Sequence, residues 1–160
     1  MALLEKQLRV KSSTLPGAGK GLFTTKFIPK GTRIAEYSGK ITTWKEVAHD
    51  EGSNGYIFYV KRSHVIDARF YPGSIARYAN DARGLQRVKG VRNNSEYEIE
   101  GLRVYVDAIR DIPAGAEILV DYGREYWQVI RYNARLHKKT AKGKKKTRTG
   151  KSSKRKGGGN

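Results

Sequence analysis

Short runs of β-branched and aromatic residues, most of them bounded by turn-forming clusters, dominate the first 122 residues. Gly, Pro, Asn or Ser separate most of these runs, so each is long enough only for a short strand. Two stretches are typical of helices, residues 42–50 and 124–138, and the polar stretch 81–95 is expected to be a loop. The sequence therefore predicts a mostly β fold of several small sheets, with few short helices and one C-terminal helix. The expected strands are residues 8–11, 21–25, 32–37, 56–60, 64–67, 102–109 and 117–122.

The composition changes abruptly after His137. Residues 138–160 contain 11 of the 33 Lys and Arg, no acidic residue and no large apolar residue. Such a segment cannot bury enough apolar surface to offset its ordering entropy, so we predict a folded domain at 1–137 and a disordered basic tail at 138–160. The tail is expected to bind nucleic acid, an acidic protein or import machinery electrostatically; a solvated tail without a specific partner is the alternative.

Several classes of site are excluded by composition. The chain has no cysteine, which excludes disulfide scaffolds, zinc–thiolate sites and thiol nucleophiles. The histidines, at 49, 64 and 137, lack the paired spacing of metal ligands, so no metal is expected. No apolar run approaches 18 residues, and charges near the N-terminus replace the apolar stretch of a signal peptide. We therefore expect an intracellular protein without a membrane segment, and nothing in the sequence indicates its oligomeric state.

The densest glycine cluster of the predicted domain is Gly17-Ala18-Gly19-Lys20-Gly21. It is not a dinucleotide fingerprint, because the third Gly comes one residue early. It is not a P-loop, because Gly21 follows Lys20 where Ser or Thr is required. A glycine loop before a strand allows a ligand to approach the backbone closely, and an ordinary turn is the alternative.

One sequence pattern, which we call the echo, occurs in two distant parts of the chain. Ile28-Pro29-Lys30-Gly31 precedes a predicted strand ending in Glu36-Tyr37, and Ile112-Pro113-Ala114-Gly115 precedes one ending in Asp121-Tyr122. The Pro-x-Gly pattern is typical of a turn, so two similar turns explain the first half of the echo. Turn formation does not explain why both strands end in an acid followed by Tyr.

Five motifs follow one another along the chain: Gly19–Phe23, Ile34–Gly39, Tyr56–Phe58 with Val65–Ala68, Arg77–Asn80, and Ile112–Gly123. In this order they resemble the SET domain, the fold of a large class of protein lysine methyltransferases. The resemblance covers roughly residues 8–136 and implies a SET-like fold. The family's Asn-His-Ser is Asn80-Asp81-Ala82 in this chain, and this part of the sequence looks closer to the PR-type branch, in which some members are mainly interaction modules. We expect no cysteine-rich zinc segment after the domain, because residues 124–160 contain no cysteine.

The resemblance implies methyl transfer from S-adenosylmethionine to a protein lysine, without a metal. Tyr122 and Tyr37 would be the catalytic residues. The Asp81 main chain would contact adenine; its side chain would bind a ribose or cap the loop. The substrate channel would include Tyr37, Val120, Tyr126 and Trp127, and the cofactor-binding positions would be Ala18, Gly19, Lys20, Gly21, Tyr56, Tyr78, Asn80 and Asp81.

The chemistry implied by the resemblance requires a neutral lysine amine, whose pKa in water is about 10.4. An apolar, Tyr-lined channel beside a positive sulfonium lowers that pKa. The expected substrate is a histone or another basic chromatin-associated protein. This places the chain at chromatin or in the nucleus of a eukaryotic cell or host, and otherwise in the cytoplasm. Two alternatives stay open: a catalytically inactive PR-type interaction module, or a basic nucleic-acid-binding protein acting through residues 138–160.

Overall fold

A computed structural model describes residues 3–48, 55–71, 73–84 and 87–123. The chain divides into two units, Met1–Tyr122 and Gly123–Asn160, and every element described below belongs to the first. The helix expected at 124–138 and the tail expected at 138–160 lie outside the described residues.

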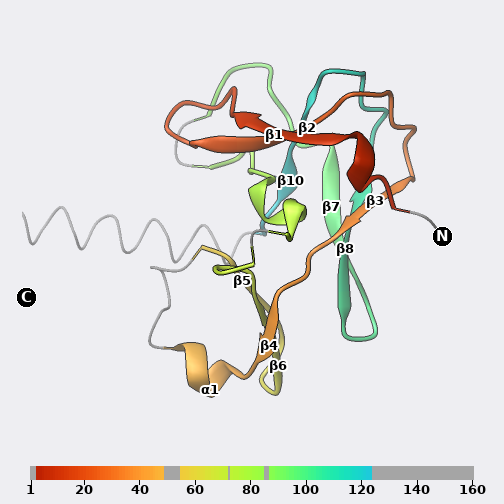
Figure 1. Ribbon diagram of the computed structural model, residues 1–160. Helices are drawn as coiled ribbons and strands as arrows, with labels where there is room; N and C mark the ends of the chain where they lie inside the picture. Colours follow the sequence, from red (N-terminus) through yellow and green to blue (C-terminus); the bar gives the residue numbers. More distant parts are fainter. Residues whose placement is uncertain (1–2, 49–54, 72, 85–86, 124–160) are drawn as a thin grey trace, which may run out of the picture. The chain divides into compact units, whose positions relative to one another are not determined.

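The described residues form three small sheets, so the expected mostly β architecture is confirmed (Figure 1). All strand pairs are antiparallel except β10 with β7, which are parallel. The first sheet has the order β1 (Leu8–Ser12), β2 (Lys20–Thr24), β9 (Glu117–Ile118). The second has the order β10 (Val120–Asp121), β7 (Ser95–Glu100), β8 (Arg103–Ala108), β3 (Arg33–Glu36). The third has the order β4 (Lys40–Thr42), β6 (His64–Asp67), β5 (Ile57–Lys61). The helical elements are η1 (Glu5–Gln7), α1 (Trp44–Val47) and η3 (Ile75–Tyr78).

Every predicted strand overlaps an observed one, but the sequence analysis missed β4 and β7. The alternating Glu-Tyr-Glu-Ile-Glu of β7 is a strand pattern, and it was overlooked because it directly follows the long polar loop. The loop predicted at 81–95 contains no strand or helix in its described residues up to 94, whereas Ser95, its last residue, begins β7. The helix expected at 42–50 is the single turn α1 in its described part.

The predicted strand 117–122 serves two sheets. Its first part, β9, pairs with β2, and its second part, β10, pairs with β7. The change occurs at Leu119, whose carbonyl accepts hydrogen bonds from the main-chain N–H groups of Asn94 and Ser95. Asn94 Oδ1 in turn accepts the Leu119 N–H at 2.9 Å. Leu119 is therefore the residue at which the chain leaves one sheet and enters the next.

The two halves of the sequence echo pair with each other. Ile28 and Ile112 form an antiparallel bridge, with N–H to carbonyl distances of 2.8 Å in both directions, and both side chains are fully buried. Gly31 and Gly115 have φ angles of 88° and 87°, so the two turns also share their backbone conformation. The echo brings the start of the strand leading to Tyr37 beside the start of the one leading to Tyr122.

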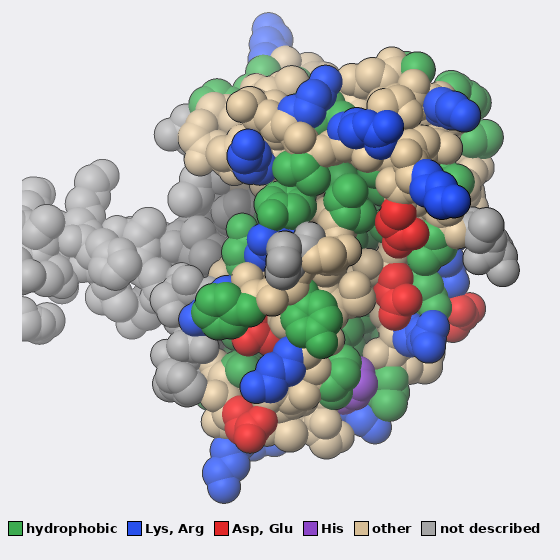
Figure 2. All heavy atoms as spheres, viewed as in Figure 1, with side chains coloured by type: hydrophobic (Ala, Val, Ile, Leu, Met, Phe, Trp, Pro, Cys, Tyr) green, Lys and Arg blue, Asp and Glu red, His purple; other side chains and the backbone are tan. Residues whose placement is uncertain are grey.

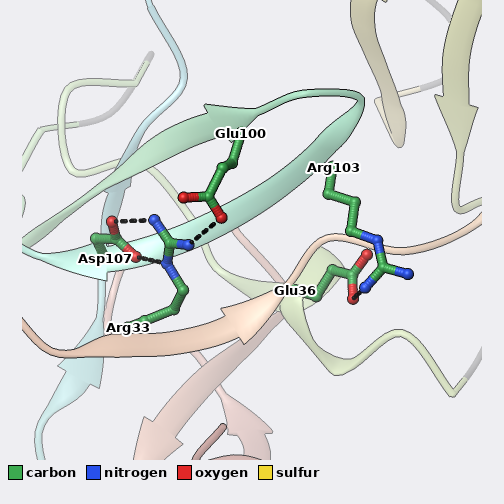
Figure 3. Close-up of polar contacts among 5 residues, drawn as sticks. All are labelled: Arg33, Glu36, Glu100, Arg103 and Asp107. Atoms are coloured by element: carbon green, nitrogen blue, oxygen red, sulfur yellow. Dashed lines mark hydrogen bonds and ion pairs between the residues drawn. The ribbon is translucent and has the colours of Figure 1, made fainter. Parts of the chain in front are cut away.

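An ion-pair network ties β3 to the β7–β8 hairpin (Figure 3). Arg33 binds Asp107 through two nitrogens, at 2.9 and 3.1 Å, and contacts Glu100 at 3.0 Å. The hydrogen bonds to Asp107 raise the pKa of the Arg33 guanidinium. Arg103 and Glu36 lie 3.9 Å apart, and hydrogen bonding to Tyr105 with the charge of Glu36 raises the pKa of Arg103. The Arg33–Asp107 pair is bidentate and its side chains are only 18% and 22% exposed, a geometry in which an ion pair stabilises the sheet.

Candidate functional site

Four aromatic rings from different elements meet within the described residues. Tyr37 follows β3, Phe58 lies in β5, Tyr97 lies in β7 and Tyr122 follows β10. Tyr97 is central, because its ring centroid lies 4.9 Å from Phe58, 5.9 Å from Tyr37 and 6.4 Å from Tyr122. The fold thus brings the two tyrosines expected to be catalytic into one ring cluster. Sequence reasoning did not count Phe58 or Tyr97 among the site residues, although the alternation in β7 places Tyr97 opposite its exposed glutamates.

Main-chain carbonyls orient the hydroxyls of two of the three tyrosines in the cluster. The Tyr122 hydroxyl donates to the carbonyl of Ala79 at 2.6 Å, and the Tyr37 hydroxyl donates to the carbonyl of Tyr56 at 2.7 Å. A phenol oxygen that donates its proton still has lone pairs with which to accept. The backbone therefore fixes the direction in which each of these two oxygens presents its lone pairs.

The Tyr122 segment is hydrogen-bonded on both sides. On one side β10 pairs with β7, so that Val120 lies opposite Ser95. On the other side the Val120 N–H donates to the carbonyl of Asn80 at 2.8 Å, and Asn80 forms a parallel bridge with Leu119. The Val120 side chain, expected in the substrate channel, is fully buried. Residues 119–122 thus run between the Asn80 segment and β7.

A buried carboxylate connects these segments. Asp81 is only 4% exposed. Its Oδ1 accepts hydrogen bonds from the Arg83 N–H and from Asn93 Nδ2, and its Oδ2 accepts one from the Tyr122 N–H, each at 2.8 Å. The Asp81 side chain therefore caps its own loop, as one of the sequence hypotheses held, and it also holds the main chain of Tyr122. Sequence reasoning gave no role to Asn93.

A second buried carboxylate anchors the glycine-rich turn. Glu117, 7% exposed, accepts hydrogen bonds from the Ser13 hydroxyl at 2.7 Å, the Thr14 N–H at 2.9 Å and the Thr14 hydroxyl at 2.6 Å. Asn80 Nδ2 lies beside it, donating to the carbonyl of Lys20 at 2.8 Å. These contacts fix both ends of the turn Leu15–Gly19. Sequence reasoning placed Glu117 in a strand and did not foresee this role.

The turn itself presents open backbone. Gly17 and Gly19 both have a φ of +72°. Apart from their chain neighbours, no heavy atom of the described residues lies within 4 Å of the position where a Cβ would stand on either glycine. Because Asn80 is bonded to the adjacent Lys20, its amide lies next to this open backbone. The positions expected to bind a cofactor, Ala18 to Gly21 and Asn80, are therefore neighbours in the structure.

The Arg77 guanidinium contacts Tyr56 and Tyr78, the two tyrosines that were expected to bind the cofactor. The Arg77 guanidinium carbon lies 4.8 Å from the ring centroid of Tyr56 and 4.7 Å from that of Tyr78. Arg77 Nη2 also donates to the Tyr78 hydroxyl at 2.7 Å, and Nη1 donates to the carbonyl of Arg69 at 2.9 Å. Tyr56 and Tyr78 are thus placed as a pair around Arg77. Tyr126 and Trp127, the other expected channel residues, lie outside the described residues.

Within the described ranges, no group of three or more His, Cys, Asp or Glu is arranged to hold a metal ion. None of the helices in this part of the chain has the length and hydropathy needed to cross a membrane.

Comparison with known proteins identifies the family of this site. The family model described as the SET domain matches residues 19–123, a range that begins at the last residue of the glycine turn and contains both carboxylates and the whole ring cluster. The chain belongs to the SET-domain family. This SET domain is 32% identical over 139 residues to the histone-lysine N-methyltransferase set-17 of Caenorhabditis elegans, an alignment that covers 84% of the chain and 48% of the relative. It is 28% identical over 129 residues to the N-lysine methyltransferase KMT5A-A of Xenopus laevis, covering 74% of the chain and 37% of the relative.

Solved structures support the same fold. A humanized mutant of the Chaetomium thermophilum Polycomb Repressive Complex 2, bound to the inhibitor GSK126, aligns with a TM-score of 0.65 and 27% identity. That alignment covers 81% of this chain and 16% of the other. This SET-domain chain therefore spans about half or less of the length of these relatives and a small part of the solved structure.

Proposed function

We propose that this SET-domain protein transfers a methyl group from S-adenosylmethionine to the side-chain amine of a protein lysine, with a histone as the first candidate substrate. The observation that carries the proposal is the Tyr122 hydroxyl, fixed on the Ala79 carbonyl at the edge of a ring cluster that includes Tyr37. The names of the relatives, histone-lysine and N-lysine methyltransferases, support the same reaction.

The residues around the glycine turn fit the proposed cofactor. S-adenosylmethionine, when bound, supplies a methyl group attached to a positively charged sulfonium. The open backbone at Gly17 and Gly19 admits the amino-acid end of such a molecule, and the Asn80 amide beside it offers a polar partner. We assign the holding of the cofactor to Ala18–Gly21, Asn80 and the Asp81 main chain, with Tyr56 and Tyr78 flanking it.

The ring cluster has two tasks in this proposal. The rings of Tyr37, Phe58 and Tyr97 would surround the lysine with apolar surface, which favours the neutral amine over the ammonium by desolvation. The oriented hydroxyls of Tyr37 and Tyr122 would place their lone pairs toward the reacting groups. Holding two reactants in near-attack geometry contributes about 7–11 kcal/mol to barrier reduction, so positioning alone supplies much of the catalysis. Val120, Tyr126 and Trp127 remain proposed channel residues.

Methyl transfer is tested with tritium-labelled S-adenosylmethionine and purified core histones, while calorimetry measures cofactor binding to the same full-length protein. We expect label on a histone and saturable cofactor binding. Neither label nor cofactor binding would leave the catalytically inactive interaction module as the better account. Cofactor binding without label would contradict the choice of histones and leave the reaction itself standing.

We also propose that residues 138–160 act as an electrostatic tether to nucleic acid, separate from a catalytic domain at 1–137. Their eleven Lys and Arg support this role. On the face viewed in Figure 2, in contrast, Lys and Arg side chains are spread out among exposed apolar ones. In this account the tail would bring the enzyme to chromatin.

Replacing these eleven Lys and Arg by Gln in the full-length chain should weaken binding to duplex DNA and flatten its salt dependence. If about five tail charges contact phosphates, the slope of log K against log salt should lose about 4.5. Fluorescence anisotropy at several salt concentrations measures the slope. Methyl transfer to a short lysine peptide, which carries no nucleic acid, should stay within about twofold of wild type, since this proposal assigns the tail no group in the site. An unchanged slope of log K for DNA binding against log salt would contradict the proposed role of residues 138–160.

A further inference from the structure

We infer that Asp81, oriented by Asn93, is a positioning residue that sets the place of the Tyr122 hydroxyl. The inference rests on the proposed function for its catalytic readout only. The short segment Ala79–Asp81 holds Tyr122 at two points: the Ala79 carbonyl accepts from the hydroxyl at 2.6 Å, and Asp81 Oδ2 accepts from the main-chain N–H at 2.8 Å. The same three residues therefore hold both the main chain of Tyr122 and the hydroxyl at the end of its side chain.

The chemistry of this contact requires a carboxylate. Among the described residues, three donors converge on Asp81: the N–H groups of Arg83 and Tyr122, and Asn93 Nδ2. An ionised carboxylate has enough lone pairs for all of them, whereas a neutral imidazole has one acceptor nitrogen. At this position, where the family motif has His, this chain therefore has a carboxylate that can accept all three bonds.

Asn93 fixes the direction in which the hydrogen bonds of this contact are donated. Its Oδ1 accepts the Ala82 N–H at 2.8 Å, so its Nδ2 must face Asp81, to which it donates. Both side chains are buried, at 8% and 4% exposure, so water does not replace these bonds readily. Donor and acceptor are therefore assigned uniquely along the path from Ala82 through Asn93 and Asp81 to Tyr122.

Because the direction of each bond is fixed, the inference can be tested by exchanging the carboxylate of Asp81 and the amide of Asn93. In Asp81→Asn the single amide oxygen is best placed opposite Arg83 and Asn93, where two donors converge. The amide NH₂ then faces the Tyr122 N–H, and that one link is lost. In the double variant Asp81→Asn with Asn93→Asp, the new carboxylate accepts from the Ala82 N–H and from the side-chain amide introduced at position 81. The oxygen of that amide then turns to Tyr122 and this link is restored, while the Arg83 N–H, which faces Asp81 Oδ1 in the wild type, loses its acceptor.

The test measures kcat, the KM for the cofactor, and amide hydrogen exchange of Tyr122 in the full-length chain. Misplacement of a reacting group by about 1 Å costs about 100-fold, so we expect Asp81→Asn to lower kcat by about 10- to 100-fold. The KM for the cofactor should stay within about twofold, because the Asp81 main chain is unchanged. Exchange of the Tyr122 amide should accelerate, and the double variant should regain most of the kcat and the slow exchange.

Asp111→Asn is the matched control, since that exposed carboxylate also accepts a main-chain N–H, from Lys30 at 2.8 Å, outside the site. It should leave kcat and the Tyr122 exchange unchanged. A double variant no better than Asp81→Asn, or an Asp81→Asn variant with wild-type kcat and exchange, would overturn the inference. If Asp81→Asn does not fold, Asn93→Ala, which keeps the carboxylate, should still accelerate Tyr122 exchange, and unchanged exchange would overturn the inference. If the wild type transfers no methyl group, the proposed function fails while hydrogen exchange still decides the role of Asp81.

Discussion

Replacing Tyr122 by Phe is expected to lower kcat for methyl transfer by at least about 100-fold, the size of loss seen when one preorganised polar group is removed from an active site. The substitution deletes the oxygen bonded to the Ala79 carbonyl and keeps the ring stacked on Tyr97. The free energy of unfolding should fall by only about 1–3 kcal/mol, the cost of one unsatisfied carbonyl. The loss would therefore be catalytic rather than structural.

Single-turnover methyl transfer at saturating cofactor measures this effect, and circular dichroism confirms the fold. Tyr59→Phe is the matched control, because Tyr59 is 48% exposed on β5 and its ring contacts Trp44 rather than the ring cluster. It should retain wild-type kcat. If Tyr122→Phe kept a third or more of the wild-type kcat, Tyr122 would not be the catalytic tyrosine.

Gly39→Ala is expected to cause the largest loss of stability. A Cβ on Gly39 would lie 2.6 Å from the carbonyl oxygen of Asp67 and 2.9 Å from the Cα of Ala68. Both contacts are with backbone, so no side chain can rotate away, and β4 must separate from β6 where Lys40 pairs with Asp67. Overpacking of this kind costs about 3 kcal/mol, and for a domain of this size Tm should fall by about 10 °C.

Thermal unfolding followed by circular dichroism measures the Tm of this variant. Gly73→Ala is the control, because no heavy atom lies within 4 Å of its Cβ position and its φ is ordinary. Its Tm should stay within about 2 °C of wild type. An equal Tm for the two variants would contradict the close approach of Gly39 to β6.

Local patterns predicted the strands and turns well, because alternation and Pro-x-Gly turns depend on neighbours in the sequence. They could not predict that Ile28 and Ile112 pair, since that contact depends on the whole fold. The same limit explains why the predicted strand 117–122 is divided between two sheets at Leu119.

The site was predicted unevenly for a similar reason. Motif order indicated Tyr37 and Tyr122, and the fold places both in one ring cluster. The roles of the two buried carboxylates were harder to predict, because the sequence does not show whether an Asp or Glu will find hydrogen-bond donors in the fold. Glu117 finds its donors at Ser13 and Thr14, 104 and 103 residues away. Only the folded chain shows that Glu117 and Asp81 are anchors of the turn and of Tyr122.

The central claim is that this chain methylates lysine by means of Tyr122. The most direct measurement is tandem mass spectrometry of core histones incubated with S-adenosylmethionine and either the full-length protein or its Tyr122→Phe variant. The account predicts a lysine that gains methyl groups with the wild type and not with the variant. Equal methylation of that lysine by both proteins would contradict it, whereas cofactor binding with no methylated lysine from either protein would contradict only the choice of histones.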